Sequence, residues 1–373
     1  MRVLFIARYR DESMTYKLDC MARDHNLILQ HITPQFWQDE LIKISQPQID
    51  NLAKPYKTTP IALVGKPNDP HRTIYKTLTF NLLQFKPDII HAEEEPDSLA
   101  ALQICIAKNS FAPKAKLILN TWQNINRPKK YSVKLVLDAT LQMANAVLCA
   151  NQEAISILNE QKFKGKTAVI PAVGVDSRIF YATKSTQAQS TPNFVIGYVG
   201  RLIKDKGLFD LLQAFNQIYT PHLYLRLIGD GNDRDALAHM AQSLPCSAQI
   251  EFLPPSPPNQ IAHQIRSLNV LVLPSKTTPV WKEQFGRVIT EAMACGVPVI
   301  GSNSGAIPEV IDNAGLIFPE GDVNALAAAL HQISQSPMLA QTLSQQGIQR
   351  VQQHFSQTVI AAKTLDFYHQ LML

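Results

Sequence analysis

Short apolar runs alternate with longer helix-like stretches through most of the chain, and this alternation restricts the fold more than any other feature. The apolar runs are continuous, which is typical of strands buried on both faces of a parallel sheet. Strand–helix repeats form right-handed βαβ units and so build a doubly wound sheet. In the first half we expect strands at residues 3–7, 27–32, 61–64, 88–91, 117–121, 146–150 and 168–170, and helices at 75–85, 97–108, 132–144 and 153–163.

A polar segment divides the alternation into two similar halves. Residues 182–193 (ATKSTQAQSTPN) are rich in Ser, Thr and Gln, which is typical of a linker. The 373 residues are enough for about two domains of about 150 residues. We therefore predict an α/β fold with two Rossmann-like, doubly wound domains, at residues 1–181 and 194–355. Two such domains leave a cleft between them, and ligands bind at the carboxyl ends of the strands.

Positive charge is concentrated in the first half of the chain. Residues 1–190 contain 24 Lys and Arg against 17 Asp and Glu, whereas residues 191–373 contain 11 against 13. The two differences, +7 and −2, add up to the net charge of +5. A basic first half indicates an anionic partner, such as an anionic membrane or an acidic acceptor, and ordinary surface charge is the alternative. We expect no nucleic-acid partner.

Cysteine usage and hydropathy indicate a cytoplasmic protein. The five cysteines are scattered without CxxC spacing, which favours a reducing compartment over disulfides or zinc. The apolar stretch after Met1 is too short for a signal peptide, and no run approaches the ~20 apolar residues of a spanning helix. We expect a cytoplasmic location, and any membrane contact, for example on the inner face of the plasma membrane, to be peripheral.

Two glutamates, Glu283 and Glu291, lie eight positions apart across a predicted helix start. A helix N-terminus holds phosphate through its free N–H groups and its positive dipole end. Gln284, Phe285 and Gly286 occupy that position, and a glycine lets a phosphate approach the backbone closely. Eight helical steps rise about 12 Å, the scale of a ribose and a hexose on either side of a diphosphate. The pattern favours a nucleotide-sugar site, and two solvated acids on a surface helix are the alternative.

A second run carries two cations just after a predicted strand, in the sequence GYVGRLIKDKG at residues 197–207. Arg201 can bind two phosphate oxygens with its planar guanidinium, and Lys206 can act as a point charge. The alternative is a pair of loop cations near a strand end. Together with the two glutamates downstream, the run favours a phosphate-binding site.

These two runs resemble the donor site of family 4 glycosyltransferases, the glycosyl transferases group 1, which have the GT-B fold. The spacing of Glu283 and Glu291 is similar to the Glu-x7-Glu motif of that family. The resemblance implies that Arg201 and Lys206 hold the donor diphosphate and neutralise the leaving group without a metal. It also implies that a last helix, about residues 358–373, packs back on the first domain.

The resemblance extends to other turns of the second half. Residues 227–231 resemble a strand-end turn that approaches the donor, residues 301–309 resemble the loop facing it, and the loops after Leu253 and Leu273 are placed to meet the base. Residues 233–235 spell DxD, which we interpret as helix capping, and we predict no metal or cofactor. The donor-binding candidates are Gly200, Arg201, Lys206, Gly229, Glu283, Gln284, Phe285, Gly286, Arg287 and Glu291.

Acceptor-side residues are expected where a strand of the first half ends. In the sequence PDIIHAEEEP, His91 matches the first His of a His-x-His pattern in the family, and Glu93 replaces the second. A carboxyl group there could orient the acceptor hydroxyl or take its proton. Adjacent carboxylates repel one another, which raises the pKa of at least one of them. The alternative interpretation is that one glutamate faces the site while the others cap the next helix. The catalytic candidates are Glu283, Arg201, Lys206, Glu93, Glu94 and Glu95.

Three further residues are acceptor-side candidates. Arg8 follows the first strand, where the family often has a pair of glycines, and could bind an acidic acceptor. Trp122 and Asn124 follow another strand and could line the cleft, although Trp122 fits a core position equally well. Four cations come next and are candidates for phospholipid headgroups or for a solvated helix face: Arg127, Lys129, Lys130 and Lys134.

The resemblance implies a retaining hexosyltransferase. Such an enzyme moves a sugar from a nucleoside diphosphate sugar to a hydroxyl of a carbohydrate or lipid-linked acceptor. No residue is an obvious covalent nucleophile, so attack on the face of the leaving group is the implied route. A sugar-nucleotide epimerase on the same fold and a non-catalytic nucleotide-sugar-binding protein are the alternatives, and a two-carboxylate glycosidase fits less well.

Overall fold

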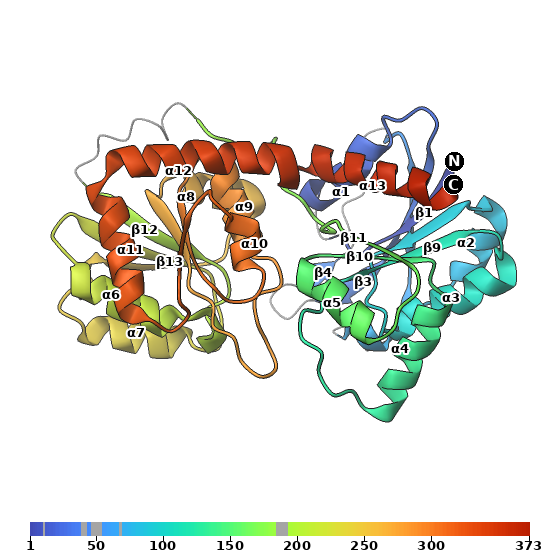
Figure 1. The fold of residues 1–373 in the computed structure, drawn as a ribbon, viewed down its shortest axis with the longest axis horizontal. Helices are drawn as coiled ribbons and strands as arrows, with labels where there is room; N and C mark the ends of the chain where they lie inside the picture. The colour runs from blue at the N-terminus through green and yellow to red at the C-terminus, as the bar shows by residue number, and fades with distance from the viewer. Residues whose placement is uncertain (10–11, 39–42, 46–53, 67–68, 184–192) are drawn as a thin grey trace. The chain divides into compact units, whose positions relative to one another are not determined.

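The computed structural model describes residues 1–9, 12–38, 43–45, 54–66, 69–183 and 193–373. These residues form two compact units (Figure 1). Unit 1 comprises Met1–Gly174 together with Gln357–Leu373, and unit 2 comprises Val175–Ser356. None of the helices in the described part of the chain combines the length and the apolar character that a membrane crossing requires.

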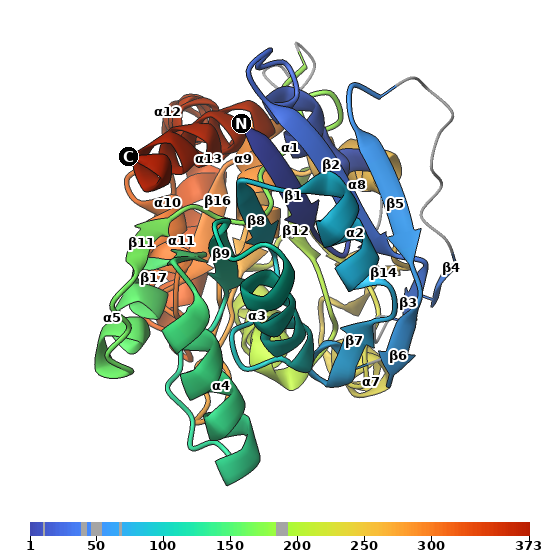
Figure 2. The same cartoon turned by 90° about the vertical axis from the view of Figure 1, so that its right-hand side faces the viewer.

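Unit 1 is built on a seven-stranded parallel sheet (Figure 2). Its strands are β1 (Arg2–Ile6), β2 (Ile28–Pro34), β5 (Lys57–Ile61), β8 (Ile89–Ala92), β9 (Lys116–Thr121), β10 (Ala146–Cys149) and β11 (Lys166–Val169). They lie in the order β11-β10-β9-β8-β1-β2-β5, so the order reverses between β1 and β8. Two antiparallel pairs lie outside this sheet, β3 (Phe36–Gln38) with β4 (Lys43–Ser45) and β6 (Leu63–Gly65) with β7 (Thr73–Tyr75).

Helices cover both faces of this sheet and enclose two apolar cores. They are α1 (Glu12–Met21), α2 (Leu78–Phe85), α3 (Leu99–Phe111), α4 (Tyr131–Met143), α5 (Gln152–Glu160) and α13 (Gln357–Met372), with a short 3-10 turn, η1 (Pro70–Arg72). Residues of α2, α3, α4 and α5 contribute to a core that contains Ile6, and residues of α1 and α13 contribute to a core that contains Phe5. Successive strand residues point to opposite faces, so Phe5 and Ile6 belong to different cores.

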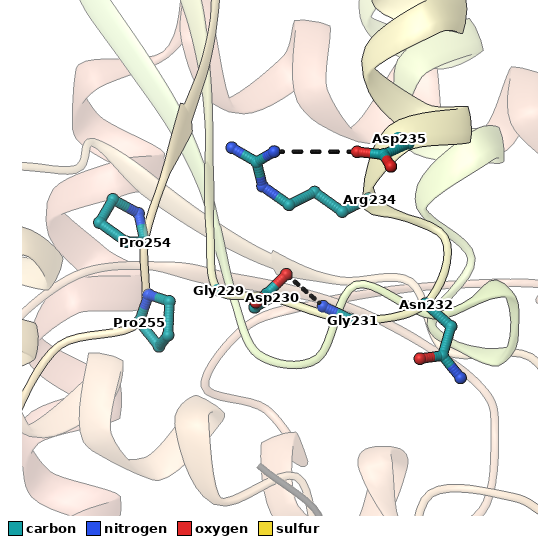
Figure 3. Close-up of a pocket in the computed structure, with 8 residues that line it drawn as sticks. All are labelled: Gly229, Asp230, Gly231, Asn232, Arg234, Asp235, Pro254 and Pro255. Atoms are coloured by element: carbon teal, nitrogen blue, oxygen red, sulfur yellow. Dashed lines mark hydrogen bonds and ion pairs between the residues drawn. The ribbon is translucent and has the colours of Figure 1, made fainter. Parts of the chain in front are cut away.

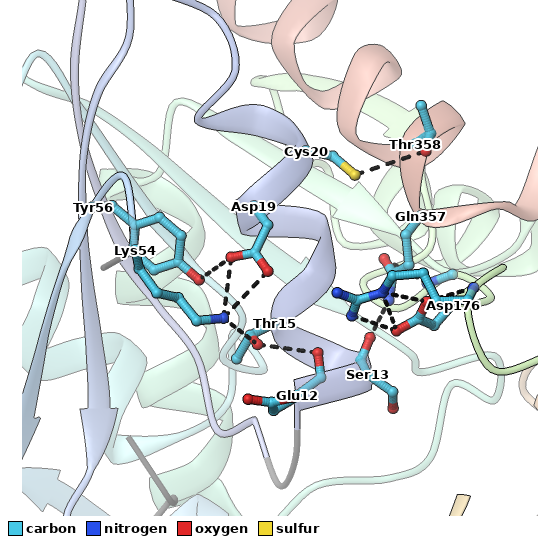
Figure 4. A network of polar contacts seen from close by, with 12 residues as sticks. Glu12, Ser13, Thr15, Asp19, Cys20, Lys54, Tyr56, Asp176, Gln357 and Thr358 are labelled. Carbon is cyan, nitrogen blue, oxygen red and sulfur yellow. Dashed lines mark hydrogen bonds and ion pairs between the residues drawn. The ribbon is translucent and has the colours of Figure 1, made fainter. Parts of the chain in front are cut away.

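Helix α13 belongs to unit 1 because it packs along α1. The side-chain amide of Gln357 donates to the carbonyl of Ser13 at 3.0 Å, and Cys20 Sγ lies 3.7 Å from Thr358 Oγ1 (Figure 4). On the other side of α1, Asp19 accepts a hydrogen bond from the Tyr56 hydroxyl at 2.8 Å and pairs with Lys54 at 3.2 Å. These contacts join the two ends of the chain within one unit.

Unit 2 is built on a six-stranded parallel sheet. Its strands are β12 (Phe194–Val199), β13 (Leu223–Ile228), β14 (Ile250–Leu253), β15 (Val270–Leu273), β16 (Val299–Ser302) and β17 (Leu316–Phe318). Their order is β14-β13-β12-β15-β16-β17, which reverses between β12 and β15. The helices and helical turns are η2 (Lys204–Lys206), α6 (Leu208–Ile218), α7 (Arg234–Ser243), η3 (Ser247–Gln249), α8 (Pro258–Arg266), α9 (Arg287–Ala294), α10 (Ile307–Ile311), α11 (Val323–Gln335), α12 (Pro337–Arg350) and the π-helical η4 (Val351–Phe355).

Two elements expected in the first half differ from the structure. The run at residues 61–64 is not one strand, because β5 ends at Ile61 and β6 begins at Leu63 in a different sheet. The helix expected at 75–85 begins only at Leu78, because the residues before it pair with β6 as β7. The apolar runs were recognised, but the turn between β5 and β6 was not.

The division between the units falls after Gly174, whereas residue 181 was expected as the end of the first domain. The N–H of Val175 donates to the carbonyl of Phe355 at 2.7 Å, and Arg266 donates to the carbonyl of Ile179 at 3.1 Å. The segment after Gly174 therefore forms its hydrogen bonds within unit 2. The linker predicted at 182–193 contains residues 184–192, which lie outside the described residues.

Candidate functional site

The donor-side candidates lie at the switch point of the unit 2 sheet, where the strand order reverses between β12 and β15. Ligands of doubly wound sheets bind at the carboxyl ends of the strands beside such a point. Arg201 and Lys206 follow β12, and Glu283 follows β15. Lys206 Nζ lies 2.5 Å from Glu283 Oε2. The two runs singled out in the sequence therefore meet in space.

The Lys206–Glu283 ion pair is largely shielded from water, since the exposed fractions of the two side chains are 12% and 10%. Ser275 Oγ donates to the same Glu283 oxygen at 2.9 Å. The ammonium of Lys206 also lies 4.7 Å from the centre of the Trp281 ring. Lys206 is thus held by a carboxylate and an aromatic face, and a phosphate that binds it must compete with Glu283.

Helix α9 begins between the two glutamates, as the sequence predicts. Gly286 is its N-cap with a φ of 77°, a left-handed conformation that favours glycine. The buried ring of Phe285 packs edge-on against Phe355, with 5.7 Å between the ring centres. Within the helix, Arg287 pairs with Glu291 at 2.7 Å. The aromatic contact of Phe285 therefore anchors the N-terminus of α9, and the Arg287–Glu291 pair lies in the first turns of the helix. Gln284 is partly exposed.

Close backbone contacts fix the turns around this ion pair. A Cβ atom at Gly229 would lie 1.9 Å from the carbonyl oxygen of Gly200, so the turns after β12 and β13 touch through their backbones. A Cβ atom at Gly305 would lie 2.0 Å from the carbonyl oxygen of Glu283, which also accepts a hydrogen bond from the N–H of Ala306 at 2.9 Å. Only glycine fits at these contacts, and the loop after β16 holds the backbone of Glu283.

Arg201 and Glu283 both influence the pKa of the same buried side chain, Tyr198. The hydroxyl of Tyr198 donates to the carbonyl of Arg201 at 2.7 Å. Burial raises the pKa of Tyr198 well above its ordinary value, the Glu283 carboxylate raises it further, and the Arg201 guanidinium opposes the rise. Both charges therefore act on one buried hydroxyl beneath the turn that follows β12.

A polar hollow of about 420 Å³ lies at the carboxyl ends of β13 and β14 (Figure 3). Its walls come from the turn after β13, the start of α7 and the two prolines after β14. The hollow therefore includes one predicted donor-binding glycine and a loop predicted to meet the base. The lining residues are Gly229, Asp230, Gly231, Asn232, Arg234, Asp235, Pro254 and Pro255.

The DxD sequence does not cap α7 in the way we expected. Asp233 occupies the N-cap position of α7, but its side chain makes no capping bond there. Its carboxylate instead accepts a hydrogen bond from the N–H of Lys204 at 2.6 Å. Asp233 therefore closes the turn η2, which carries Lys206, and Asp235 lies exposed in the first turn of α7.

The acceptor-side candidates lie at the switch point of the unit 1 sheet, beside the ends of β1 and β8. Glu93, Glu94 and Glu95 directly follow β8. The next helix, α3, is capped by Ser98, whose Oγ accepts a hydrogen bond from the N–H of Ala101 at 3.0 Å. The alternative in which some of the glutamates cap this helix is therefore wrong, and each glutamate has a different set of partners.

Glu93 is held by a buried cation. It forms an ion pair with Lys17 of α1 and accepts a hydrogen bond from the Tyr9 hydroxyl at 2.8 Å. Burial raises the pKa of Glu93, Lys17 and Tyr9 oppose the rise, and the neighbouring Glu94 contributes least. The neighbouring carboxylate thus raises this pKa, as the sequence predicts, but burial is the largest cause of the rise.

Glu94 and Arg8 neutralise each other. The guanidinium of Arg8 donates to Glu94 at 3.0 Å and to Thr73 at 2.9 Å, and the hydroxyl of Tyr75 donates to Glu94 at 2.7 Å. Glu94 is buried. Arg8 was predicted to bind an acidic acceptor, but in this structure its charge is balanced inside unit 1.

Glu95 has neutral hydrogen-bond partners, unlike its two neighbours. It accepts from Thr121 Oγ1 at 2.8 Å and from the N–H of Trp122 at 2.7 Å. Burial raises the pKa of Glu95 to about 7, against the effect of these two hydrogen bonds. A carboxyl group with such a pKa exchanges a proton close to neutral pH.

Asp97 ties the loop after β9 to the turn η1. It accepts from Lys129 at 2.6 Å and from Gln123 at 2.9 Å, and it lies 3.2 Å from His71 Nδ1. Although burial opposes it, these contacts hold the pKa of Asp97 well below its usual range, and the contact with Asp97 raises the pKa of His71. Lys129, a predicted headgroup-binding cation, is thus engaged within unit 1.

His91 has a structural position and not the acceptor-side position that we predicted. Its side chain is fully buried, with Nδ1 2.5 Å from the Tyr368 hydroxyl and Nε2 2.7 Å from Asn120 Oδ1. Burial lowers the pKa of His91 to about 3, so the ring is neutral. Asn124 is also buried, and Trp122 is partly buried against the core that contains Phe5.

Four residues of the site were missed in the sequence. Ser275 and Trp281 contact the Lys206–Glu283 pair, and Lys17 and Tyr75 neutralise or bind the glutamates after β8. Ser275 lies two positions beyond the end of an apolar strand, where site residues are expected, so its position in the sequence could have identified it. Lys17 and Tyr75 lie in other elements, and no local pattern marks them.

The protein has two doubly wound units of the GT-B type, with the Lys206–Glu283 ion pair and the N-terminus of α9 at the switch point of the second unit. Solved glycosyltransferases share this fold. The chain is similar to a glycosyltransferase from Rickettsia africae (TM-score 0.76, 16% identity, 100% of this chain and 98% of that chain). It is also similar to HepE from Anabaena, solved in complex with UDP (TM-score 0.73, 19% identity, 99% and 100%).

The sequence comparison finds a family match in the second half of the chain. Residues 182–350 match glycosyl transferases group 1, so this chain carries a domain of that family, as the two motifs predicted. A similar curated protein is the capsular polysaccharide biosynthesis glycosyltransferase CapM of Staphylococcus aureus, which is 31% identical over 189 residues, or 48% of this chain and 47% of that protein. The match spans about half the length of this relative and of the N-acetyl-alpha-D-glucosaminyl L-malate synthase of Bacillus anthracis.

Proposed function

We propose that this protein is a retaining glycosyltransferase that moves a hexose from a nucleoside diphosphate sugar to a hydroxyl of a carbohydrate or lipid-linked acceptor. The observation that carries the proposal is the contact between Lys206 and Glu283 beside the glycine cap of α9, inside a group 1 domain. A cation and a helix tip suit a diphosphate, and a carboxylate suits sugar hydroxyls.

In the proposed complex, Lys206 and Arg201 bind the diphosphate and stabilise the negative charge that develops as it leaves. The amides from Gln284 to Gly286 add donors at the helix tip. Because these groups supply the positive charge, the proposal includes no metal and no cofactor. The diphosphate competes for Lys206, so Glu283 is released to accept hydrogen bonds from the sugar hydroxyls, while Ser275 keeps the carboxylate in place.

The nucleoside is proposed to bind next to this diphosphate site. Glu291 is assigned to the ribose hydroxyls, and the polar hollow beside Gly229 is assigned to the base. The Anabaena protein HepE has been solved with UDP, so UDP sugars are the first donors to test. Arg287 pairs with Glu291 and is assigned the role of orienting that carboxylate.

Glu95 is the proposed group for the acceptor. Its pKa of about 7 suits a carboxyl group that orients a hydroxyl or takes its proton near neutral pH. Glu93 and Glu94 are held by Lys17 and Arg8, so they have structural roles in this proposal.

Attack by the acceptor on the same face of the sugar as the leaving group accounts for retention of configuration without a covalent nucleophile. A lipid-linked acceptor would place the enzyme at the cytoplasmic face of the plasma membrane.

The test is a transfer reaction with purified protein, UDP-, GDP- or ADP-sugars, and carbohydrate or lipid-linked acceptors. The proposal expects nucleotide release that depends on an acceptor. Isomerised sugar without transfer would instead identify an epimerase. A non-catalytic nucleotide-sugar-binding protein is the second candidate, because Glu93 stands where the family has a His and is tied to Lys17; nucleotide binding without release under any acceptor would support it.

A further inference from the structure

Three neighbouring helices of unit 1 carry large apolar side chains on their outer surface. Helix α3 lies between α2 and α4 on one face of the sheet (Figure 2). On α2, Phe80 is 67% exposed and Leu83 is 50% exposed. Ile106 of α3 is 53% exposed, and Tyr131 and Leu135 of α4 are 78% and 51% exposed. We call this surface the α2–α4 face.

Helical spacing directs these side chains away from the core. Helix α2 is apolar on both sides, since Leu78 and Leu82 are buried while Phe80 and Leu83 are exposed. A helix that is apolar all round is normally covered on both sides. On α3, Leu99 and Ile106 are two turns apart and so share one exposed stripe. Several large apolar side chains exposed on neighbouring helices indicate an interaction site.

The same face is basic. From residue 98 to residue 137 the chain contains seven Lys and Arg and no Asp or Glu. Arg127, Lys130 and Lys134 are exposed around the N-terminal end of α4, and Lys76 is exposed just before α2. The acid that α4 carries, Asp138, lies 3.6 Å from Lys134. Apolar side chains and an excess of cations therefore occur together on these helices.

We propose that the α2–α4 face binds the surface of an anionic lipid bilayer. The aromatic and aliphatic side chains would enter the boundary between headgroups and acyl chains, and the cations would meet the lipid phosphates. Charge distinguishes this partner from a second copy of the chain, because two equally basic faces repel each other. A bilayer of anionic lipid supplies both an apolar layer and a negative surface.

The structure changes which residues are expected to contact lipid. Lys129 is held by Asp97 and Gln123, so it is not part of the face, whereas Arg127, Lys130 and Lys134 are. The apolar residues of α2 and α3 complete the face.

The inference goes beyond sugar transfer and depends on the proposed function only where a lipid-linked acceptor is concerned. Lipid binding is measured without donor or acceptor, so its failure and a failure of transfer are separate results.

The experiment is co-sedimentation of the full chain with vesicles of phosphatidylcholine alone or with phosphatidylglycerol added. Two variants test the face: Phe80→Ser combined with Leu83→Ser, and Lys130→Glu combined with Lys134→Glu. We expect binding only to the vesicles that contain phosphatidylglycerol. Binding should decrease about tenfold or more in both variants, because one removes two apolar contacts and the other reverses two charges. The binding should also weaken strongly in about 1 M salt.

Matched controls carry the same changes elsewhere. Met338→Ser removes an apolar side chain that is 80% exposed on α12 of unit 2, and Lys164→Glu reverses an exposed charge of unit 1 after α5. Both controls should bind as the wild type does. Because all substituted residues are exposed, melting temperatures should stay close to the wild-type value, which separates lost binding from lost folding.

Two results would overturn the inference. One is wild-type protein that stays in the supernatant with anionic vesicles. The other is equal vesicle binding by the wild type and both variants. If the variants instead convert a dimer into a monomer in size-exclusion chromatography without changing vesicle binding, the α2–α4 face is an interface between copies of the chain, and the bilayer is rejected as its partner.

Discussion

Replacing Lys206 with Ala removes the cation that lies 2.5 Å from Glu283. If this cation binds the diphosphate, its loss removes a hydrogen bond to a charged group, which contributes about 1.5–3 kcal/mol. Affinity for a nucleoside diphosphate should then fall about 10- to 150-fold. The Glu283 side chain is 10% exposed in the wild type. Without Lys206 its negative charge is no longer balanced and repels the diphosphate, so we expect a loss toward the upper end of that range.

A second substitution separates the two effects. Glu283→Gln added to Lys206→Ala removes the repelling charge and should restore part of the affinity. Glu283→Gln alone frees Lys206 for the phosphate, so the affinity for the diphosphate should stay the same or rise, while the extra affinity of the sugar nucleotide over the diphosphate is lost. Lys204→Ala is the matched control, since Lys204 is exposed on the same turn.

The assay is isothermal calorimetry with UDP, GDP and ADP in the absence of acceptor, supported by thermal melts. At a nucleotide concentration of about 100 times Kd, binding stabilises the wild type by about 2.7 kcal/mol. A 30-fold weaker variant would retain about 0.9 kcal/mol under the same conditions. Equal nucleotide affinity in the wild type and in Lys206→Ala would contradict the role proposed for Lys206, and so would a loss of the same size in Lys204→Ala.

Four further predictions concern the other sites. The pKa of Glu95 in the folded protein is about 7, above its ordinary value of 4.5. Its contribution to the free energy of unfolding is therefore fully present below pH 4.5 and is lost as the pH rises through about 7. Glu95→Gln should remove that slope from thermal melts measured across this range, and should abolish any rise of transfer activity near pH 7. Gly229→Ala should lower both the melting temperature and nucleotide affinity, with a cost of about 1–3 kcal/mol, because the added Cβ would lie 1.9 Å from the carbonyl oxygen of Gly200. Glu94→Ala leaves Arg8 buried without its carboxylate and should destabilise the protein by about 3–5 kcal/mol in urea unfolding, with a smaller loss when Arg8→Met is added. Transfer activity should be the same with and without a metal chelator, since Arg201 and Lys206 are proposed to hold the diphosphate.

The contact between the donor-side candidates could be predicted because its signals are local in sequence. Arg201 and Lys206 follow one continuous apolar strand, and Glu283 precedes a helix start marked by Gly286. The carboxyl ends of neighbouring parallel strands meet at one edge of a sheet, so residues after β12 and β15 are expected to be close. The ion pair follows from that topology, although its competition with a phosphate becomes visible only in the structure.

The acceptor side could not be predicted because its partners come from distant elements. Lys17 and Glu93 are 76 positions apart, and Tyr75 reaches Glu94 from a strand outside the main sheet. The sequence does not distinguish the three adjacent glutamates. In the structure, Glu93 and Glu94 each form an ion pair with a cation from another element, whereas Glu95 accepts hydrogen bonds from neutral groups. Burial then controls the pKa values of Glu93 and Glu95, and burial follows from the tertiary structure.

The most direct test of the proposed diphosphate site is whether tight binding requires the second phosphate of the nucleotide. Calorimetric titration of the wild-type chain with UDP and UMP, and with the guanosine and adenosine pairs, isolates the contribution of the phosphate assigned to Lys206 and the tip of α9. We predict that at least one nucleoside diphosphate binds at least about tenfold more tightly than its monophosphate. Equal affinity for every mono- and diphosphate pair, or no binding of any of the three diphosphates, would contradict it.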